Sequence, residues 1–385
     1  MQLAKLILRN ALRHKLRTGL TILGLVIAVV SFGLLQTIVD AWYAGANAAS
    51  PNRLVTRNAI SLVFPMPLHY REKIRAVDGV QSVAAASWFG GQYQDPKKFF
   101  PQFAIDAVPY FAMYSEYRVA EEEMRAFLRD RKGAIVGRKL SQTYGFKVGD
   151  VIPIQGTIYP GNWAFTVRAI YDGVEAKTDT SQMFFHWEYL NETVKQKMPA
   201  RADRVGVFVV RIDDPARSAA LSREIDAQFR NSAAETLTET EKAFQLGFVA
   251  MTEAIVVGIR IVSFVVIFII LAVMANTMAM TARERLAEHA TLKALGFGPA
   301  YVASLILGES LAIALAGGAL GVALTFPVAA WFGLQTGALF PVLEVSVLTV
   351  AMQLGCALAV GVAAAILPGQ RAARVRIAEG LRAIR

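Results

Sequence analysis

The residue types that carry out chemistry in enzymes do not gather into a recognisable site along this 385-residue chain. The four histidines are scattered, and His69 and His186 are expected to be surface or packing residues. A phosphate-binding loop requires G-x-x-x-x-G-K-[S/T] spacing, which is absent from the nearest stretch, Gly133, Gly137, Arg138 and Lys139. With no clustered metal ligands and no nucleophile beside a base, we expect no catalysis, metal or cofactor in this chain.

One charged segment between two apolar runs has the pattern of a docking helix. Residues 282–295 are good helix formers, Gly296 stands where a C-terminal cap belongs, and Gly298-Pro299 prevents continuation into the next run. Charges alternate with leucines, which suits docking onto a partner subunit, although a solvated connector has the same composition. The residues expected to make this contact are Arg283, Glu284, Arg285, Glu288, Lys293, Leu295 and Gly296.

A basic segment precedes the first apolar run. Its cationic residues recur at a spacing of four among apolar ones, which predicts an amphipathic helix on a membrane surface. The alternative is a basic anchor that only fixes topology. The four residues are Lys5, Arg9, Arg13 and Arg17.

Glu309 is a carboxylate inside a long apolar run. Such a group costs about 2.5–3.5 kcal/mol on insertion scales, so it usually faces protein or water and often marks a pathway. We favour a structural pairing for Glu309 over a place in a transport pathway.

Membrane-spanning helices must position these segments. The chain is 55% hydrophobic with a mean hydropathy of +0.41, and four stretches offer the roughly 20 nearly charge-free residues that a span needs. The third is interrupted by glycines and Pro327, which predicts that its helix ends near Thr325. The first is too long for the core of a cleaved signal peptide. The stretches are Thr18–Val39, Ile261–Thr281, Ala300–Phe332 and Val345–Leu367.

The basic residues predict the orientation. The segment before the first span carries five positive charges, the loop between the second and third a net +1, and the segment after the fourth a net +4, which together equal the net charge of +10. Both termini and the middle loop are therefore predicted to be cytoplasmic. These charges lie at membrane edges, where anionic lipid attracts them, so we expect no nucleic-acid partner. The single cysteine, Cys356, leaves the exported region without a disulfide.

The exported region is predicted to extend from about Asp40 to Gln245, enough for one or two folded domains. A helix and a strand are predicted at each of its ends, which favours one α+β layer closed by both arms of the chain. The middle is predicted to be β-rich, with a hairpin-like pair of strands. The predicted elements are a helix at 67–77, strands at 80–89, 151–155, 163–171 and 205–212, and a helix at 215–229.

Three segments resemble ABC permeases of the MacB/FtsX type. The coupling-helix region of that family is similar to Asn276-Thr277-Met278 with Arg283-Glu284-Arg285, Glu288 and Lys293-Ala294-Leu295-Gly296. Its opening looks like Arg9-Asn10-Ala11-Leu12-Arg13 with Lys15-Leu16-Arg17-Thr18, and its ending like Arg371-Ala372-Ala373-Arg374 with Glu379 and Leu381-Arg382. The tail departs from the family pattern at Ile377, usually proline, and Gly380, usually alanine.

The resemblance implies an integral membrane α-helical protein with four transmembrane helices in a one-plus-three topology and a large α+β periplasmic domain between the first two. It implies a multi-pass permease subunit of a bacterial inner membrane, coupling ATP hydrolysis to periplasmic movement (mechanotransmission) for export or efflux. ATP and Mg would be bound by two copies of a separate ABC ATPase. Further partners would be a second permease copy, a periplasmic adaptor, an outer-membrane channel and membrane lipid.

Two other functions remain open. One is a lipoprotein-release permease of the same family, and the other is a membrane-anchored periplasmic sensor. The predicted segments are the amphipathic helix at 1–17, the spans at 18–40, 255–281, 300–326 and 345–367, the periplasmic domain at 41–245 with its α+β layer at about 52–112 and 200–231 and its insertion at about 113–199, the coupling helix at 282–298 and the tail at 368–385.

Overall fold

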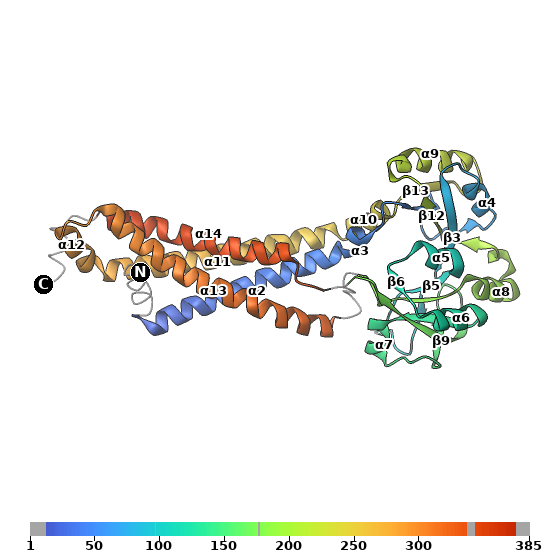
Figure 1. Cartoon of the computed structure of the whole chain (residues 1–385), viewed down its shortest axis with the longest axis horizontal. Coiled ribbons are helices and arrows are strands. Elements are labelled where there is room, and N and C mark those ends of the chain that lie inside the picture. Colours follow the sequence, from blue (N-terminus) through green and yellow to red (C-terminus); the bar gives the residue numbers. More distant parts are fainter. Residues whose placement is uncertain (1–12, 97, 176–177, 337–342, 375–385) are drawn as a thin grey trace. The chain divides into compact units, whose positions relative to one another are not determined.

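The computed structural model describes residues 13–96, 98–175, 178–336 and 343–374. These form two compact units: a helical unit, with the described residues up to Asp40 and then 253–335 and 343–374, and a sheet unit, chiefly Ala41–Thr252 (Figure 1). The predicted surface-helix residues Lys5 and Arg9 lie outside the described residues, as does the predicted tail beyond Arg374.

Four helices in the described part of the chain are long and apolar enough to cross a membrane. They contain the four apolar stretches that the sequence indicates, and a short helix, α12, follows the second of them. The helices are α2 (Lys15–Trp42), α11 (Glu253–Glu284), α12 (Leu286–Ala294), α13 (Pro299–Gln335) and α14 (Val347–Arg374).

The predicted end of the third span is wrong, because α13 passes through Pro327 and continues to Gln335. A proline removes one backbone hydrogen bond, which neighbouring helices and hydroxyl side chains can offset in a membrane bundle. Here the Thr325 hydroxyl donates to the carbonyl of Gly321 (2.8 Å), and Gln353 Nε2 of α14 donates to Thr325 Oγ1 (2.7 Å).

Helix α14 extends beyond the predicted fourth span. Helix α14 passes through Pro368 and reaches Arg374, so the segment predicted as a tail begins as helix. Pro368 and Gly369 are buried against the rest of the bundle, and packing of this kind outweighs the loss of one helical hydrogen bond.

The predicted coupling helix at 282–298 is divided in the structure. Helix α11 continues to Glu284, Arg285 leaves the helical conformation (φ −102°, ψ 17°), and α12 covers only 286–294. The predicted cap is present: Gly296 has φ +92°, its N–H donates to the carbonyl of Lys293 (3.0 Å), and the N–H of Phe297 donates to that of Leu292 (3.1 Å). These two bonds are a Schellman motif, which fixes where α12 ends.

Small residues allow the spans to approach closely. A Cβ atom at Gly317 or Gly321 of α13 would lie 2.8 or 2.7 Å from the side chains of Leu25 or Val29 of α2. This is the close helix contact that small residues permit in membranes.

The sheet unit contains one large sheet and one two-stranded sheet among its described residues. Its strands are β1 (Arg53–Asn58), β2 (Met66–Pro67), β3 (Val80–Trp88), β4 (Gly91–Gln92), β5 (Gln102–Ile105), β6 (Tyr117–Arg118), β7 (Gly133–Gly137), β8 (Val151–Gly156), β9 (Gly161–Gly173), β10 (Met183–His186), β11 (Arg204–Val205), β12 (Val207–Ile212) and β13 (Thr236–Thr240). Its α-helices are α3 (Ala44–Ala48), α4 (Tyr70–Arg75), α5 (Ala107–Met113), α6 (Glu121–Arg129), α7 (Arg138–Tyr144), α8 (Trp187–Lys197), α9 (Ser218–Gln228) and α10 (Glu241–Met251).

The two arms of the chain interleave in the large sheet. Its order is β13-β1-β12-β3-β5-β10-β7-β9-β8-β4, with β6 paired to β9. Strands β1 and β3 from the first arm therefore alternate with β12 and β13 from the second. The sequence predicts one layer closed by both arms, but not this alternation. The β-rich middle does not form a sheet of its own, because β10 pairs with β5 in parallel and extends the same sheet.

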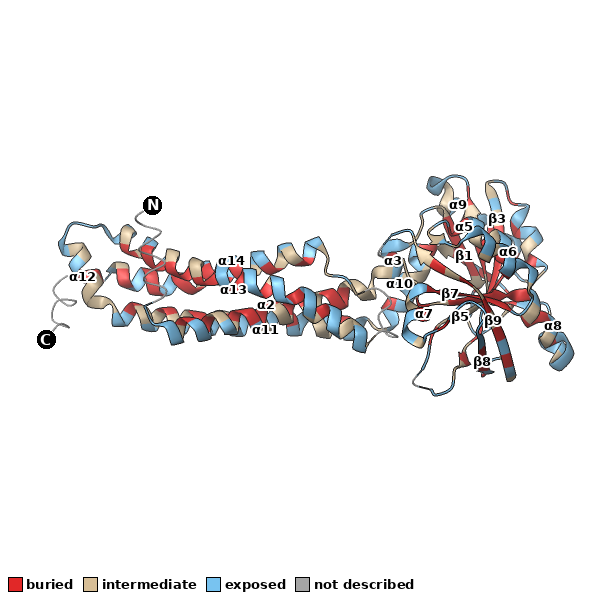
Figure 2. Ribbon diagram, turned by 60° about the horizontal axis from the view of Figure 1, so that its bottom comes forward, coloured by how far each residue is buried: buried red, intermediate tan, exposed pale blue. Residues whose placement is uncertain are grey.

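Both faces of this sheet are buried (Figure 2). On one face Phe185, Phe165 and Val83 pack with α4, α8 and α9, and on the other Phe184 and Val209 pack with α5 and α6. Neighbouring residues of a strand point to opposite faces, so β10, with every residue buried, contributes to both cores.

A buried ion-pair network surrounds Arg53 at the start of β1. Arg53 Nε lies 2.7 Å from Glu241 Oε2, and Arg53 Nη2 lies 2.5 Å from Glu116 Oε1. Glu241, the first residue of α10, also accepts from the Tyr114 hydroxyl (2.9 Å) and from the backbone N–H of Ser50 (3.0 Å). The network thus joins the segment that enters the sheet unit to the helix that leaves it.

We expect Arg53→Met to reduce the free energy of unfolding by about 3–5 kcal/mol, because it leaves Glu241 buried without its cation. Thermal unfolding of the detergent-solubilised chain measures this. The matched control is Arg131→Met, which breaks the exposed pair with Glu192 and should cost under about 1 kcal/mol. Equal losses of unfolding free energy in the two variants would contradict a stabilising role of the buried Arg53 network.

His289 makes the packing of α12 sensitive to pH. The side chain is 2% exposed, and its Nδ1 has no hydrogen-bond partner among the described residues. Burial, aided by the positive charges of Arg285 and Lys293 and opposed by Glu288, lowers the pKa of His289 from 6.5 to about 4. A state with α12 displaced and His289 hydrated would take up a proton more readily, so the packing weakens as pH falls from 6.5 towards 4.

We therefore expect amide protection factors in α12, corrected for intrinsic exchange, to be roughly 30-fold lower at pH 5 than at pH 7.5. Hydrogen exchange followed by mass spectrometry of the chain in nanodiscs measures them. His289→Gln should abolish this pH dependence, and its persistence in that variant would disprove the role of His289.

Candidate functional site

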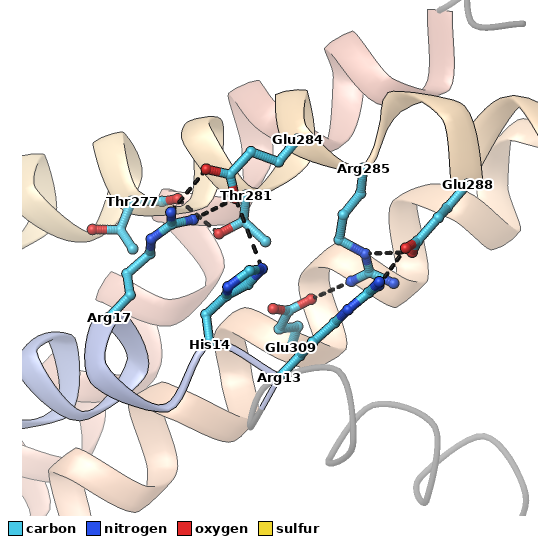
Figure 3. Close-up of polar contacts among 9 residues, drawn as sticks. All are labelled: Arg13, His14, Arg17, Thr277, Thr281, Glu284, Arg285, Glu288 and Glu309. Atoms are coloured by element: carbon cyan, nitrogen blue, oxygen red, sulfur yellow. Dashed lines mark hydrogen bonds and ion pairs between the residues drawn. The ribbon is translucent and has the colours of Figure 1, made fainter. Parts of the chain in front are cut away.

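Charged side chains from four segments meet where α12 lies against the spans, a region we call the α12 end (Figure 3). The segments are the start of α2, the end of α11, α12 itself and the first part of α13. Arg17 of α2 makes a two-pronged contact with Glu284 of α11: Nη1 lies 2.6 Å from Oε2, and Nη2 lies 2.8 Å from Oε1. His14 Nε2 lies 4.0 Å from the same carboxylate.

A chain of ion pairs runs from the surface to the interior of the α12 end. Arg13 pairs with Glu288, Arg285 Nε lies 2.8 Å from Glu288 Oε2, and Arg285 Nη1 lies 3.0 Å from Glu309 Oε2. The exposed fractions of the side chains fall along this series: 57% for Arg13, 41% for Glu288, 12% for Arg285 and 7% for Glu309. The outer pair is screened by solvent and the inner one is not.

Glu309 has the structural partner that we favour from the sequence. Removing one member of a buried pair typically costs about 3–5 kcal/mol, so Arg285 cannot leave Glu309 without a large penalty. Two cavities of about 10 Å³ each, room for about one water molecule, lie beside Glu309. One is lined by hydroxyls, including Thr18, Thr277 and Thr281. Cavities of this size offer no path for a substrate.

Glu288 stays charged at neutral pH. Burial acts to raise the pKa of this carboxyl, but hydrogen bonds from Arg285 and Arg13 outweigh burial and hold the pKa below its usual range. The carboxylate that lies between Arg13 and Arg285 is therefore negatively charged at neutral pH.

The outward surface of the α12 end is apolar. Leu295 is 71% exposed and Phe297 43% exposed, and the ring of Phe297 stacks on Tyr301 with centroids 4.7 Å apart. We call Leu295 and Phe297 with Gly296 between them the apolar turn. Because the Schellman motif fixes the backbone here, the turn presents these side chains in a defined conformation.

The residues predicted to form the docking surface divide into two groups. Glu284, Arg285 and Glu288 are engaged in pairs within the chain, and Lys293 Nζ donates to the carbonyl of Ala373 of α14 (2.7 Å). The exposed group is Arg283, Leu295 and Gly296. Sequence reasoning missed Phe297. A large apolar residue between two glycines in a loop could have indicated an exposed contact residue.

Two of the four residues of the predicted membrane-surface helix make ion pairs within the chain. Arg13 and Arg17 pair with carboxylates of the chain, while Lys5 and Arg9 lie outside the described residues. The sequence carried a signal for this pairing, because a basic segment and the acidic residues Glu284 and Glu288 were both assigned to one side of the membrane.

The remaining sequence candidates have packing roles. His186 Nε2 lies 2.9 Å from the carbonyl of Phe127, on whose ring it stacks. A Cβ at Gly137 would lie 1.9 Å from the carbonyl oxygen of Thr180, and Arg138 pairs with Asp172. Within the described residues, no group of three or more His, Cys, Asp or Glu is arranged to hold a metal ion.

Comparison with known families matches most of the chain. Residues 18–228 match the MacB-like periplasmic core domain, and residues 260–377 match the FtsX-like permease C-terminal domain. An uncharacterised ABC transporter permease of Mycobacterium tuberculosis is 25% identical over 54% of this chain, but the match spans only 23% of that protein. An uncharacterised ABC transporter permease of Methanocaldococcus jannaschii is 23% identical over 82% of this chain and 80% of its own length.

Two solved structures are similar to part of the chain. The periplasmic region of MacB from Actinobacillus actinomycetemcomitans is 10% identical, with a TM-score of 0.36, over 52% of this chain and 94% of that one. The extracellular domain of the transporter YknZ from Gram-positive bacteria is 12% identical, with a TM-score of 0.35, over 49% of this chain and 100% of that one.

The periplasmic core match alone covers more than half of the chain, and the permease match covers α13, α14 and most of α11. The chain is therefore a membrane protein with a large extracytoplasmic domain and belongs to the MacB/FtsX family of ABC transporter permeases.

Proposed function

We propose that this chain is the membrane subunit of an ABC transporter, that a separate ATPase subunit binds and hydrolyses ATP with Mg, and that the ATPase docks on the α12 end. The α12 end would then be cytoplasmic, with both termini on the same side. Membership of the permease family supports transport over the sensor that the sequence left open.

One observation carries this proposal: α12 is fastened to α13 by the buried Arg285–Glu309 pair while the apolar turn remains exposed. A partner that binds the turn therefore displaces α12 and α13 together. Aromatic and aliphatic side chains that fill a pocket are typical anchors of protein interfaces, which suits Leu295 and Phe297.

The connection towards the sheet unit follows the chain. Helix α11 begins at Glu253, just after α10, and Glu241 at the start of α10 is held by the Arg53 network. Movement of α11 would reach the sheet unit through this buried joint. In the full assembly we propose a pair of permease chains with two ATPase subunits, moving their extracytoplasmic domains for export, with an adaptor and an outer-membrane channel as further partners.

We expect Leu295→Asp and Phe297→Asp each to weaken association with the ATPase at least about tenfold, since truncation or charging of an interface anchor costs 2 kcal/mol or more. Co-purification of the chain in nanodiscs with candidate ATPase subunits of the same source measures this. Val174→Asp, at an exposed apolar residue of the sheet unit, is the matched control. Undiminished association of both turn variants would contradict docking at the apolar turn.

Glu309→Gln should leave docking of the ATPase intact while it prevents transmission of movement from α12 to α13. The amide keeps the volume of the carboxylate but no longer holds Arg285 by charge, so α12 can move without α13. We expect ATPase association to stay within about twofold, an effect under 0.5 kcal/mol, while the ATP-dependent change in hydrogen exchange of the sheet unit is lost. A normal ATP-dependent change in this variant would show that the pair does not transmit movement.

A further inference from the structure

Two of the ion pairs at the α12 end differ from the rest because they bring in the segment at the start of α2. Arg13 pairs with Glu288 and Arg17 with Glu284, across more than 260 residues of sequence. We propose that these two pairs form a releasable latch, and that anionic lipid headgroups compete with Glu284 and Glu288 for the two arginines. The lipid charge of the membrane would then set how firmly the α12 end is held to α2.

The position of the arginines places them at headgroup depth. The apolar run of α2 begins at Thr18, directly after Arg17. Leu16 and Leu20 are 80% and 61% exposed, as expected for residues that contact lipid at the edge of a span. The bilayer surface therefore lies within reach of Arg13 and Arg17 without movement of the helix, because long side chains can turn towards the interface.

The two states of the latch are close in free energy. Exposed ion pairs contribute little because both partners remain hydrated and screened, and an anionic surface attracts a juxtamembrane arginine by a similar amount. The side chain of Arg13 is 57% exposed and that of Arg17 28% exposed, and the two carboxylates are each about 40% exposed. The Arg285–Glu309 pair is nearly buried and cannot exchange in this way, so lipid acts on the latch alone.

Opening the latch changes what α12 is attached to. With the latch closed, ion pairs connect all four segments of the α12 end: the start of α2, the end of α11, α12 and α13. With the latch open, α12 remains fastened to α13 but is released from α2. The regulatory consequence rests on the proposed function, since it assumes that the α12 end receives the ATPase, whereas the lipid response of the latch does not.

The test measures the latch directly, without any ATPase. Spin labels are attached to Leu16→Cys and Thr291→Cys, both exposed positions, in a Cys356→Ala background of the full chain. Distances between them are compared in nanodiscs of phosphatidylcholine and in nanodiscs containing phosphatidylglycerol. We expect a narrow distribution in the neutral lipid and a longer, broader one in the anionic lipid. Inorganic phosphate added to neutral nanodiscs at matched ionic strength should leave the distribution narrow, because the competing anion is the membrane surface.

A charge swap provides the decisive comparison. In Arg17→Glu with Glu284→Arg the pair can form again, but the residue on α2 is repelled by anionic lipid. The shift between the two lipids should therefore be smaller than in the unmodified chain, and Arg13 accounts for the part that remains. The swap Arg131→Glu with Glu192→Arg, in an exposed pair of the sheet unit, should respond to lipid as the unmodified chain does. Identical distributions in both lipids, or a shift that the Arg17–Glu284 swap does not reduce, would overturn the latch. Failure of the unmodified chain to bind any ATPase would overturn the proposed function and leave the latch intact.

Discussion

A carboxylate within an apolar helix needs a partner to remain charged, and in this chain the partner of Glu309 is Arg285. This requirement sets the arrangement of the α12 end. Arg285 reaches Glu309 because the chain leaves the helical conformation at Arg285 and starts α12 in a new direction. The break between α11 and α12 and the burial of His289 on the inner side of α12 are both consistent with this single electrostatic constraint.

The same principle recurs at the other end of the spans. The Asp40 carboxylate of α2 accepts hydrogen bonds from the hydroxyls of Ser346 and Thr349 (both 2.9 Å), which lie at the start of α14. Between the two ends, Gln353 Nε2 donates to the carbonyl of Val29 (2.8 Å), in space that exists because residue 33 is glycine. Polar groups inside a bilayer must be satisfied within the protein, so these contacts fix the position of α14 against α2.

Sequence reasoning succeeded where one local pattern decides the structure and failed where a distant partner decides it. The apolar runs, the β8–β9 hairpin and the Gly296 cap depend on neighbouring residues, and all are present. The end of α13 was misplaced because packing from other helices keeps Pro327 within the helix. For the same reason the pairing of Arg285 with Glu309, which lies 24 residues further along the chain, could not be read from the sequence.

The α12 end contains both a buried ion pair and more exposed ones, and the two kinds differ in how easily they separate. A buried pair resists separation because each charge would be left in a medium that solvates it poorly, whereas an exposed pair exchanges its partners with water, salt or lipid at little cost. At the α12 end the buried pair joins α12 to α13, whereas the more exposed pairs join the start of α2 to α12 through Glu288 and to α11 through Glu284. In the proposed function, exposure of the charges, more than their number, would therefore decide which helices move together.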